Sequence, residues 1–324
     1  MNNPKKANIF VLALIIFSVL ASFVLSFVIL KSGADIDKAQ LVLIITQDLI
    51  ILLIPIVVYC MVTHTRFLNI IPHERLSVKN VLYIILLTVL TAPIIMVVSA
   101  VTTLFYPADI NIEIYDYINK LPLSLCMLAL AVMPAVFEEL VFRGVILSNY
   151  KSVSLLKAAL VSGLFFGLFH MDFYQMGYAF IAGVFFSFLV RYTNSIYASI
   201  LSHFIINGTQ VAYTKLILSV FGNLNMEEML EQTGQPSDSY EAIAAGIFFT
   251  VIATPILIMV SKKFMEHNKN HKLDYELSIL QKEPEEFEIA IDEIKSDKKG
   301  FADIYFILYI AVAIVFTLLF RAGT

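Results

Sequence analysis

Nine apolar runs, each close to the length of a membrane-spanning helix, restrict the fold of this chain more than any other feature. The runs cover approximately residues 8–30, 41–63, 80–105, 121–147, 154–171, 174–191, 195–219, 241–261 and 302–320. A spanning helix needs about 20 mostly apolar residues, and backbone groups in lipid must find partners within the segment. None of the runs shows the alternation of an outer-membrane barrel strand. The sequence predicts an all-α polytopic membrane protein, a bundle of about eight to nine transmembrane helices.

Composition supports this fold class and excludes several functions. Apolar residues make up 59% of the chain and charged residues 15%, against roughly 45–50% and about 25% in soluble proteins. The mean hydropathy is +0.82 and the net charge is −4, so there is no basic field for nucleic acid. Cys60 and Cys126 lie in apolar runs, where a thiol is expected to pack as a small hydrophobic side chain. A cytosolic enzyme, a disordered chain, a nucleic-acid binder and a disulfide scaffold are excluded.

Basic residues predict the orientation of the chain. If the N-terminus is cytoplasmic and nine spans alternate, 17 of the 22 Lys and Arg residues fall on the cytoplasmic side. Such a bias is typical of cytoplasmic loops. We therefore expect an integral protein of the cell membrane with its N-terminus inside.

The runs divide the chain into five parts. These are three N-terminal spans (1–120), a four-span core (121–220), an outer loop with one span (221–260), a charged cytoplasmic loop (261–300) and a last span (301–324).

Two adjacent glutamates interrupt the fourth run. An ionisable side chain at membrane depth costs several kcal/mol unless it is paired or faces a cavity. On a helix, Glu139 and Arg143 are four residues apart and can pair. Glu138 points about 100° away around the helix and is the candidate general base. The expected roles are therefore structural for Glu139 with Arg143 and chemical for Glu138, in a polar cavity of the bundle.

Two histidines and an asparagine lie on other runs. His170 ends the fifth run, and His203 and Asn207 are four residues apart in the seventh. Without a metal, Glu138 and His170 can polarise a water for attack on an amide carbonyl, while His203 and Asn207 donate to the oxyanion. With a metal, Glu138, His170 and His203 form the ligand set of a catalytic zinc ion. Both chemistries fit the spacing.

The order and spacing of three motifs resemble the signature of the CPBP family of intramembrane proteases. This family comprises CAAX-prenyl-endopeptidase-like and bacteriocin-processing (Abi) proteins, and the likeness covers roughly residues 121–220. The motifs are Glu138-Glu139-x-x-x-Arg143, Phe166-x-x-x-His170 and His203-x-x-x-Asn207.

The resemblance implies hydrolysis of a peptide bond at or within the membrane. It assigns water activation to Glu138 and His170 and oxyanion stabilisation to His203 and Asn207, with Glu139 and Arg143 as further motif positions. Family members are described both as metal-free glutamate proteases and as metalloproteases. We expect the metal-free form without a cofactor, with Zn²⁺ as the alternative. The expected partners are membrane lipids and a membrane-embedded or lipidated substrate, such as a prenylated protein or a bacteriocin or pheromone precursor.

Two other classes of function remain alternatives at this point. One is a non-catalytic scaffold or immunity protein, and the other is a proton-coupled transporter that uses Glu138 and the histidines as a relay. Asp48, in the second run, is either an interhelix hydrogen-bond partner or part of such a relay.

Depth within the membrane raises a difficulty for the catalytic pairing. At a rise of about 1.5 Å per residue, Glu138 and His203 lie about 14 Å and about 12 Å from the cytoplasmic ends of their helices. His170 lies about 24 Å from that end. The pairing therefore requires a strong tilt or a deep start of the fifth helix. Gly163 and Gly167, four residues apart on that helix, predict a close approach by a neighbouring helix.

Overall fold

The computed structural model describes residues 3–32, 49–105, 118–221, 236–270 and 302–322, and within these ranges the chain is helical with one isolated β-bridge. The all-α polytopic membrane fold is therefore confirmed. The elements are α1 (Pro4–Ser32), η1 (Leu49–Leu53), α3 (Ile54–Val62), α4 (Phe67–Ile70), α5 (Val78–Phe105), α7 (Leu123–Met127), η2 (Leu128–Val132), α8 (Met133–Glu139), η3 (Leu140–Ile146), α9 (Leu147–Asn149), α10 (Leu155–Phe169), α11 (Phe173–Thr193), α12 (Ile196–Phe221), α14 (Pro236–His267) and α17 (Ile304–Ala322).

Every predicted span has a helical counterpart, but the helices differ in length. Among the described residues, six helices are long and apolar enough to cross a membrane: α1, α5, the run 123–149, α11, α14 and α17. Two apolar helices, 49–62 and α10, are shorter. Helix α12 has 26 residues but carries the polar His203 and Asn207. Asp48 and most of the predicted loop 261–300 lie outside the described residues, and α14 extends to His267.

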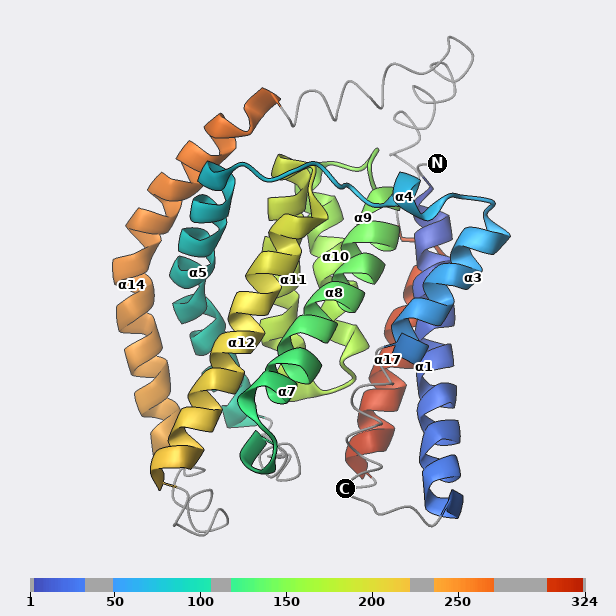
Figure 1. Cartoon of the computed structure of the whole chain (residues 1–324), viewed down its shortest axis with the longest axis horizontal. Coiled ribbons are helices and arrows are strands. Elements are labelled where there is room, and N and C mark those ends of the chain that lie inside the picture. Colours follow the sequence, from blue (N-terminus) through green and yellow to red (C-terminus); the bar gives the residue numbers. More distant parts are fainter. Residues whose placement is uncertain (1–2, 33–48, 106–117, 222–235, 271–301, 323–324) are drawn as a thin grey trace.

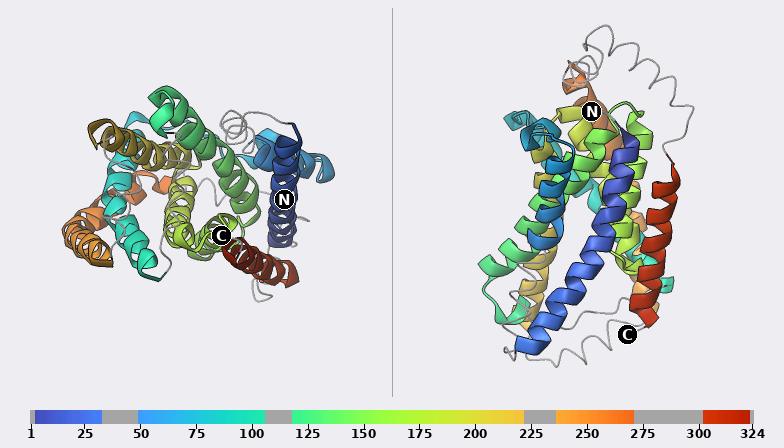
Figure 2. Two further views of the ribbon diagram at one scale, coloured as in Figure 1. Left: turned by 90° about the horizontal axis from the view of Figure 1, so that it is seen from below. Right: turned by 90° about the vertical axis from the view of Figure 1, so that its right-hand side faces the viewer.

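The helices form three groups side by side. Helices α5 and α14 lie at one edge of the molecule, and α1, α3 and α17 lie at the other (Figures 1 and 2). Between them stand α10, α11, α12 and the continuous helical run from α7 to α9. This central group contains all the residues singled out by the three motifs.

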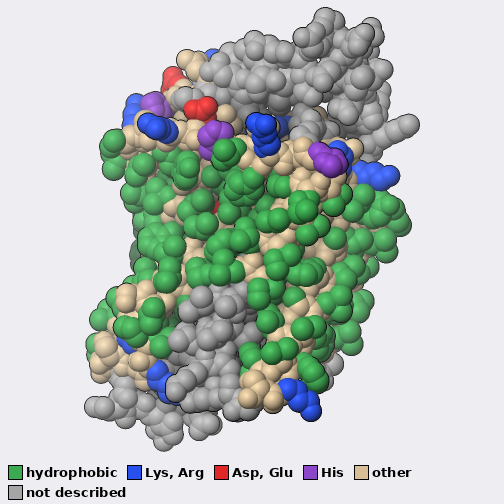
Figure 3. Space-filling model, turned by 45° about the vertical axis from the view of Figure 1, so that its right-hand side comes forward, with side chains coloured by type: hydrophobic (Ala, Val, Ile, Leu, Met, Phe, Trp, Pro, Cys, Tyr) green, Lys and Arg blue, Asp and Glu red, His purple; other side chains and the backbone are tan. Residues whose placement is uncertain are grey.

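The surface is banded as a membrane protein requires. Apolar side chains cover a broad middle zone, while Lys, Arg and His side chains gather toward the ends (Figure 3). Several helix ends predicted to share one side do lie together. Asn80, at the start of α5, and Asn268, just after α14, exchange two side-chain hydrogen bonds of 2.9 and 3.0 Å. The Ile196 N–H at the start of α12 donates to the Pro72 carbonyl at 2.7 Å.

The helical run from α7 to α9 is locally widened before and after its glutamates. Residues 128–132 and 140–146 form π-helical turns. Pro134, at the first turn of α8, has no N–H and cannot donate to the Leu130 carbonyl four residues earlier. Proline therefore releases a backbone acceptor one turn before Glu138, on the side where α12 packs.

Helices α10 and α11 form a hairpin and approach closely at Gly163 and Gly167, where a close approach was predicted. A Cβ added at Gly163 would lie 2.6 Å from Val184 Cγ2, and one at Gly167 would lie 2.7 Å from the Met176 carbonyl oxygen. The turn between the helices contains Met171 at φ 50°. Asp172 caps α11 by accepting the Tyr174 N–H at 2.9 Å. The hairpin turn ends short of the lower ends of α1 and α12 (Figure 1).

Candidate active site

Glu139 and Arg143 form the buried ion pair that their spacing predicted. Arg143 Nη1 lies 2.9 Å from Glu139 Oε1, and both side chains are fully buried. Helical geometry places the two on one face because they are one turn apart. A pair this deep in a bundle stabilises the fold only while both partners are present.

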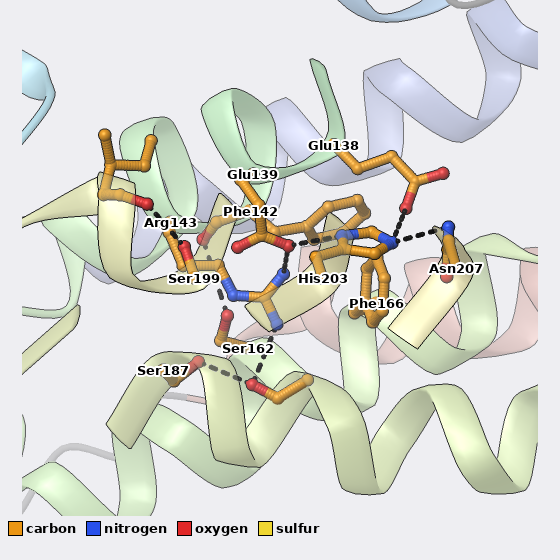
Figure 4. A network of polar contacts seen from close by, with 12 residues as sticks. Glu138, Glu139, Phe142, Arg143, Ser162, Phe166, Ser187, Ser199, His203 and Asn207 are labelled. Atoms are coloured by element: carbon orange, nitrogen blue, oxygen red, sulfur yellow. Dashed lines mark hydrogen bonds and ion pairs between the residues drawn. The ribbon is translucent and has the colours of Figure 1, made fainter. Parts of the chain in front are cut away.

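The guanidinium of Arg143 has further partners that the sequence reasoning missed. Its Nη2 donates to the Gly183 carbonyl at 2.8 Å, and the same carbonyl accepts the Ser187 hydroxyl at 2.9 Å (Figure 4). The rings of Phe166 and Phe186 lie 4.8 and 5.2 Å from the guanidinium carbon. Aromatic faces attract a cation in this range, most strongly where water is absent. Arg143 is thus fixed by a carboxylate, a carbonyl and two rings.

His203 lies between the two glutamates. Its Nδ1 is 3.0 Å from Glu139 Oε1, and its Nε2 is 3.9 Å from Glu138 Oε2 (Figure 4). Because an ionised carboxylate can only accept, Nδ1 carries the proton toward Glu139. Phe186 stacks on the imidazole at 5.1 Å between centroids and an interplanar angle of 24°. The ring is therefore held on its edge and on its face.

Asn207 contacts both His203 and the backbone acceptor released by Pro134. Its Nδ2 is 3.4 Å from the Leu130 carbonyl oxygen and 3.2 Å from His203 Nε2. A carbonyl only accepts, so the amide nitrogen faces this way and donates. In the tautomer with its proton on Nδ1, His203 accepts from Asn207 through Nε2. An imidazolium form of His203 would instead offer an Nε2 proton near Glu138.

His170 joins the same cluster through Phe166. The Phe166 ring lies 4.9 Å from His170 and 5.8 Å from His203, edge-on to both. These contacts show that the calculated difference in depth does not separate the two histidines. His170 Nδ1 lies 2.8 Å from the Phe166 carbonyl, so this nitrogen is the donor and Nε2 is left as an acceptor in the neutral ring.

A hydroxyl pair fixes the helix face that carries His203. Ser202 Oγ and Thr88 Oγ1 lie 2.7 Å apart, and both side chains are buried. Thr88 also donates to the Ile84 carbonyl at 2.7 Å, so Ser202 is the donor in the pair. The link joins α12 to α5, a helix that none of the three motifs includes. Polar hydroxyls within apolar runs were the only sequence signal for this contact.

The zinc alternative requires Glu138, His170 and His203 to lie close enough together to bind one metal ion. Within the described ranges, no group of three or more His, Cys, Asp or Glu residues is placed to hold a metal ion. Glu138 and His203 are neighbours, and the bond of His170 Nδ1 to a backbone carbonyl leaves its Nε2 available, as it is in many zinc-bound histidines. The zinc alternative therefore stays a prediction.

The fold and this cluster define a class of protein. The chain is a polytopic all-α membrane protein whose interior gathers two glutamates, an arginine, two histidines and an asparagine from three helical segments. Residues 120–209 match the family described as Type II CAAX prenyl endopeptidase, Rce1-like. The resemblance carried by the three motifs is therefore confirmed over this segment, and the family indicates a CAAX-type intramembrane protease. No curated protein and no solved structure gives a significant match.

Proposed function

We propose that the protein is an intramembrane endopeptidase in which Glu138 and His170 activate water and His203 and Asn207 stabilise the oxyanion. One observation carries the proposal: the motif residues of three separate helical segments meet in one buried to half-buried cluster inside the family-matched segment. A cluster with this many ionisable groups is costly in a membrane bundle and marks a functional site by default.

Water activation is supported by the protonation pattern of His170 and by the location of Glu138. The His170 Nδ1 proton is used on the Phe166 carbonyl, so Nε2 can orient a water or accept its proton. Glu138 keeps 15% of its side chain exposed, whereas Glu139 is fully buried and paired. Glu138 therefore takes a proton from the water, whose oxygen attacks the carbonyl carbon. The proton then passes to the leaving amine nitrogen as the C–N bond breaks.

Oxyanion stabilisation requires a small change from the arrangement described here. Both Asn207 contacts, to Leu130 and to His203, engage its Nδ2. A substrate carbonyl that entered beside Asn207 would take over one of these hydrogens as charge develops on its oxygen. His203 contributes a second donor only as an imidazolium, because Glu139 already accepts from Nδ1. Glu139 is thus placed to support the positive charge that this role demands.

The substrate and the location follow from the family and the charge pattern. We propose a membrane-embedded or lipidated peptide or protein as substrate, a prenylated C-terminus being the form that the matched family suggests. The excess of Lys and Arg in alternate loops favours a cytoplasmic N-terminus in the cell membrane. We expect lipid to contact the apolar middle zone of the surface (Figure 3).

The test is peptide cleavage by the full chain reconstituted in liposomes. A quenched farnesylated CAAX peptide and the same peptide without the prenyl group are compared, before and after chelation. We expect cleavage that survives chelation, that is abolished in Glu138→Gln and His170→Ala, and that prefers the lipidated peptide. Cleavage that chelation abolishes and zinc restores would overturn the metal-free mechanism. Absence of cleavage of either peptide and of a transmembrane peptide library would overturn the protease assignment.

A further inference from the structure

The C-terminal helix α17 lies outside the family-matched segment, yet it makes a buried polar contact with the helix that ends at His170. The Tyr309 hydroxyl donates to the Phe165 carbonyl at 2.7 Å, and Tyr309 is fully buried. Its ring meets the Phe165 ring edge-on at 5.0 Å, and Phe306 of the same helix lies 5.4 Å from that ring. A tyrosine hydroxyl inside a membrane bundle needs a partner, and here the partner is the last turn of α10.

Phe165 and Phe166 are adjacent in the sequence, but their rings contact different parts of the molecule. Phe165 faces α17, whereas Phe166 contacts Arg143, His170 and His203. The rotation of this turn about the α10 axis therefore decides where Phe166 and His170 lie. On its other side the turn is limited by the close approach of α11 at Gly167. Contact with α17 completes the restraint.

A second contact fixes α17 lengthwise. Asp303, just before α17, accepts the Asn8 side-chain amide at 3.0 Å, and Asn8 accepts the hydroxyl of Tyr150. Tyr150 directly follows α9, the end of the helical run that carries both glutamates. Helix α17 is thus tied to that run through α1 at one end and to α10 further along its length. Both ties are buried or part-buried polar contacts.

We propose that Tyr309 is a positioning residue for His170: α17 holds the last turn of α10 through the Tyr309 hydroxyl and the rings on Phe165, and so orients the His170 imidazole. This rests on the proposed function in that His170 is taken to act on water. The contact itself is independent of the chemistry. The hydrogen bond joins residues that are 144 positions apart in the sequence. Through it, α17 supports the active site although this helix lies outside residues 120–209.

The test replaces the hydroxyl alone, in Tyr309→Phe. The full chain, labelled with ¹⁵N-histidine in nanodiscs, reports the His170 ring nitrogens, whose signals are assigned by their loss in His170→Ala. We expect the His170 signals to move more than those of His203, which the Phe166 ring also contacts. We expect kcat on the quenched peptide to fall roughly tenfold, about the effect of one lost hydrogen bond, with KM unchanged.

The matched control is Thr317→Val on the same helix. Thr317 is also buried, but its hydroxyl donates within α17, to the Ala313 carbonyl at 2.7 Å. This variant should leave the His170 signals and kcat at their wild-type values. Should Tyr309→Phe not fold, Phe306→Leu takes its place, because it loosens the ring contact and keeps the hydrogen bond.

The two readouts separate the two claims. Unmoved His170 signals in the folded Tyr309→Phe protein, or in Phe306→Leu if it is used instead, would overturn the positioning role. Moved signals in a protein that never cleaves a peptide would uphold the positioning role and count against the proposed function.

Discussion

At the scale of single residues, the site depends on an ion pair with no access to water. Glu139 accepts from both Arg143 and His203, and its side chain is fully buried. The desolvation of two charges offsets much of their attraction, so such a pair is not a large net source of stability. Removing one partner is different, because it leaves the other charge buried without compensation. The pair therefore makes both residues sensitive to single substitution.

Glu139→Gln should lower the stability of the protein by about 3–5 kcal/mol, because Arg143 is left as an uncompensated buried charge. Thermal unfolding in detergent measures the loss of stability. It is monitored by the fluorescence of an added dye, because the chain contains no tryptophan. The double variant Glu139→Gln with Arg143→Met removes both charges and should recover part of the stability. A wild-type melting temperature in a Glu139→Gln protein that cleaves nothing would reverse the assigned roles of the two glutamates.

Asn207→Ala should lower kcat by roughly 10²–10³, the effect of removing one oxyanion donor. The amide that faces Leu130 and His203 is the group lost. Gln210→Ala is the matched control, since Gln210 is an exposed amide one turn further along α12. Steady-state cleavage of the quenched peptide measures both variants. Wild-type rates in Asn207→Ala would remove Asn207 from the mechanism.

At the scale of elements, the site depends on how closely α10 and α11 approach. A Cβ added at Gly183 would lie only 2.8 Å from the Gly163 Cα, so the two helix backbones are in close contact. Gly183 also offers its carbonyl to Arg143 at 2.8 Å. Small residues at facing positions allow helix backbones to meet in membranes. The same contact therefore packs the hairpin and brings an acceptor to the guanidinium.

Gly163→Ala should destabilise the hairpin and lower cleavage, because the new Cβ would lie 2.9 Å from both the Phe180 carbonyl oxygen and the Val184 backbone nitrogen. Backbone atoms cannot yield as a side-chain end can, so α11 must shift away from Arg143. Gly144→Ala is the control, since its Cβ would meet nothing closer than 3.5 Å. Melting temperature and cleavage rate are measured together. Equal melting temperatures and rates in the two variants would show that the hairpin tolerates the extra methyl group.

At the scale of the whole molecule, the sequence predicted the spans and the motif residues because lipid allows few alternatives. Apolar runs must be helices, and charged residues within them must be paired. The Glu139–Arg143 pair followed from helical spacing alone. The support from Gly183, Thr88 and Tyr309 could not be predicted, because small residues and single hydroxyls are common in apolar runs. These residues support the site only through contacts between segments that are distant in sequence, as α5 and α17 make with the core.

The depth of His170 is the clearest case in which an estimate from residue counts failed. Residues 154–171 read as a full span, and on that basis His170 lies too deep to meet Glu138. Helix α10 covers nearly this range, yet the Phe166 ring contacts both His170 and His203. The number of residues from the helix start therefore did not give the relative position of these side chains. That position depends on how the helices pack against one another, which hydropathy does not encode.

The orientation of the whole molecule is testable with two cysteines at opposite ends. Lys79 is exposed at the start of α5, and Lys120 is exposed before α7, at the other end of the bundle. The excess of basic residues predicts that the end with Lys79 is cytoplasmic. In a chain with Cys60 and Cys126 replaced by alanine, Lys120→Cys should react with an impermeant maleimide in intact cells. Lys79→Cys should react only after the membrane is opened, and the opposite pattern would place the N-terminus outside.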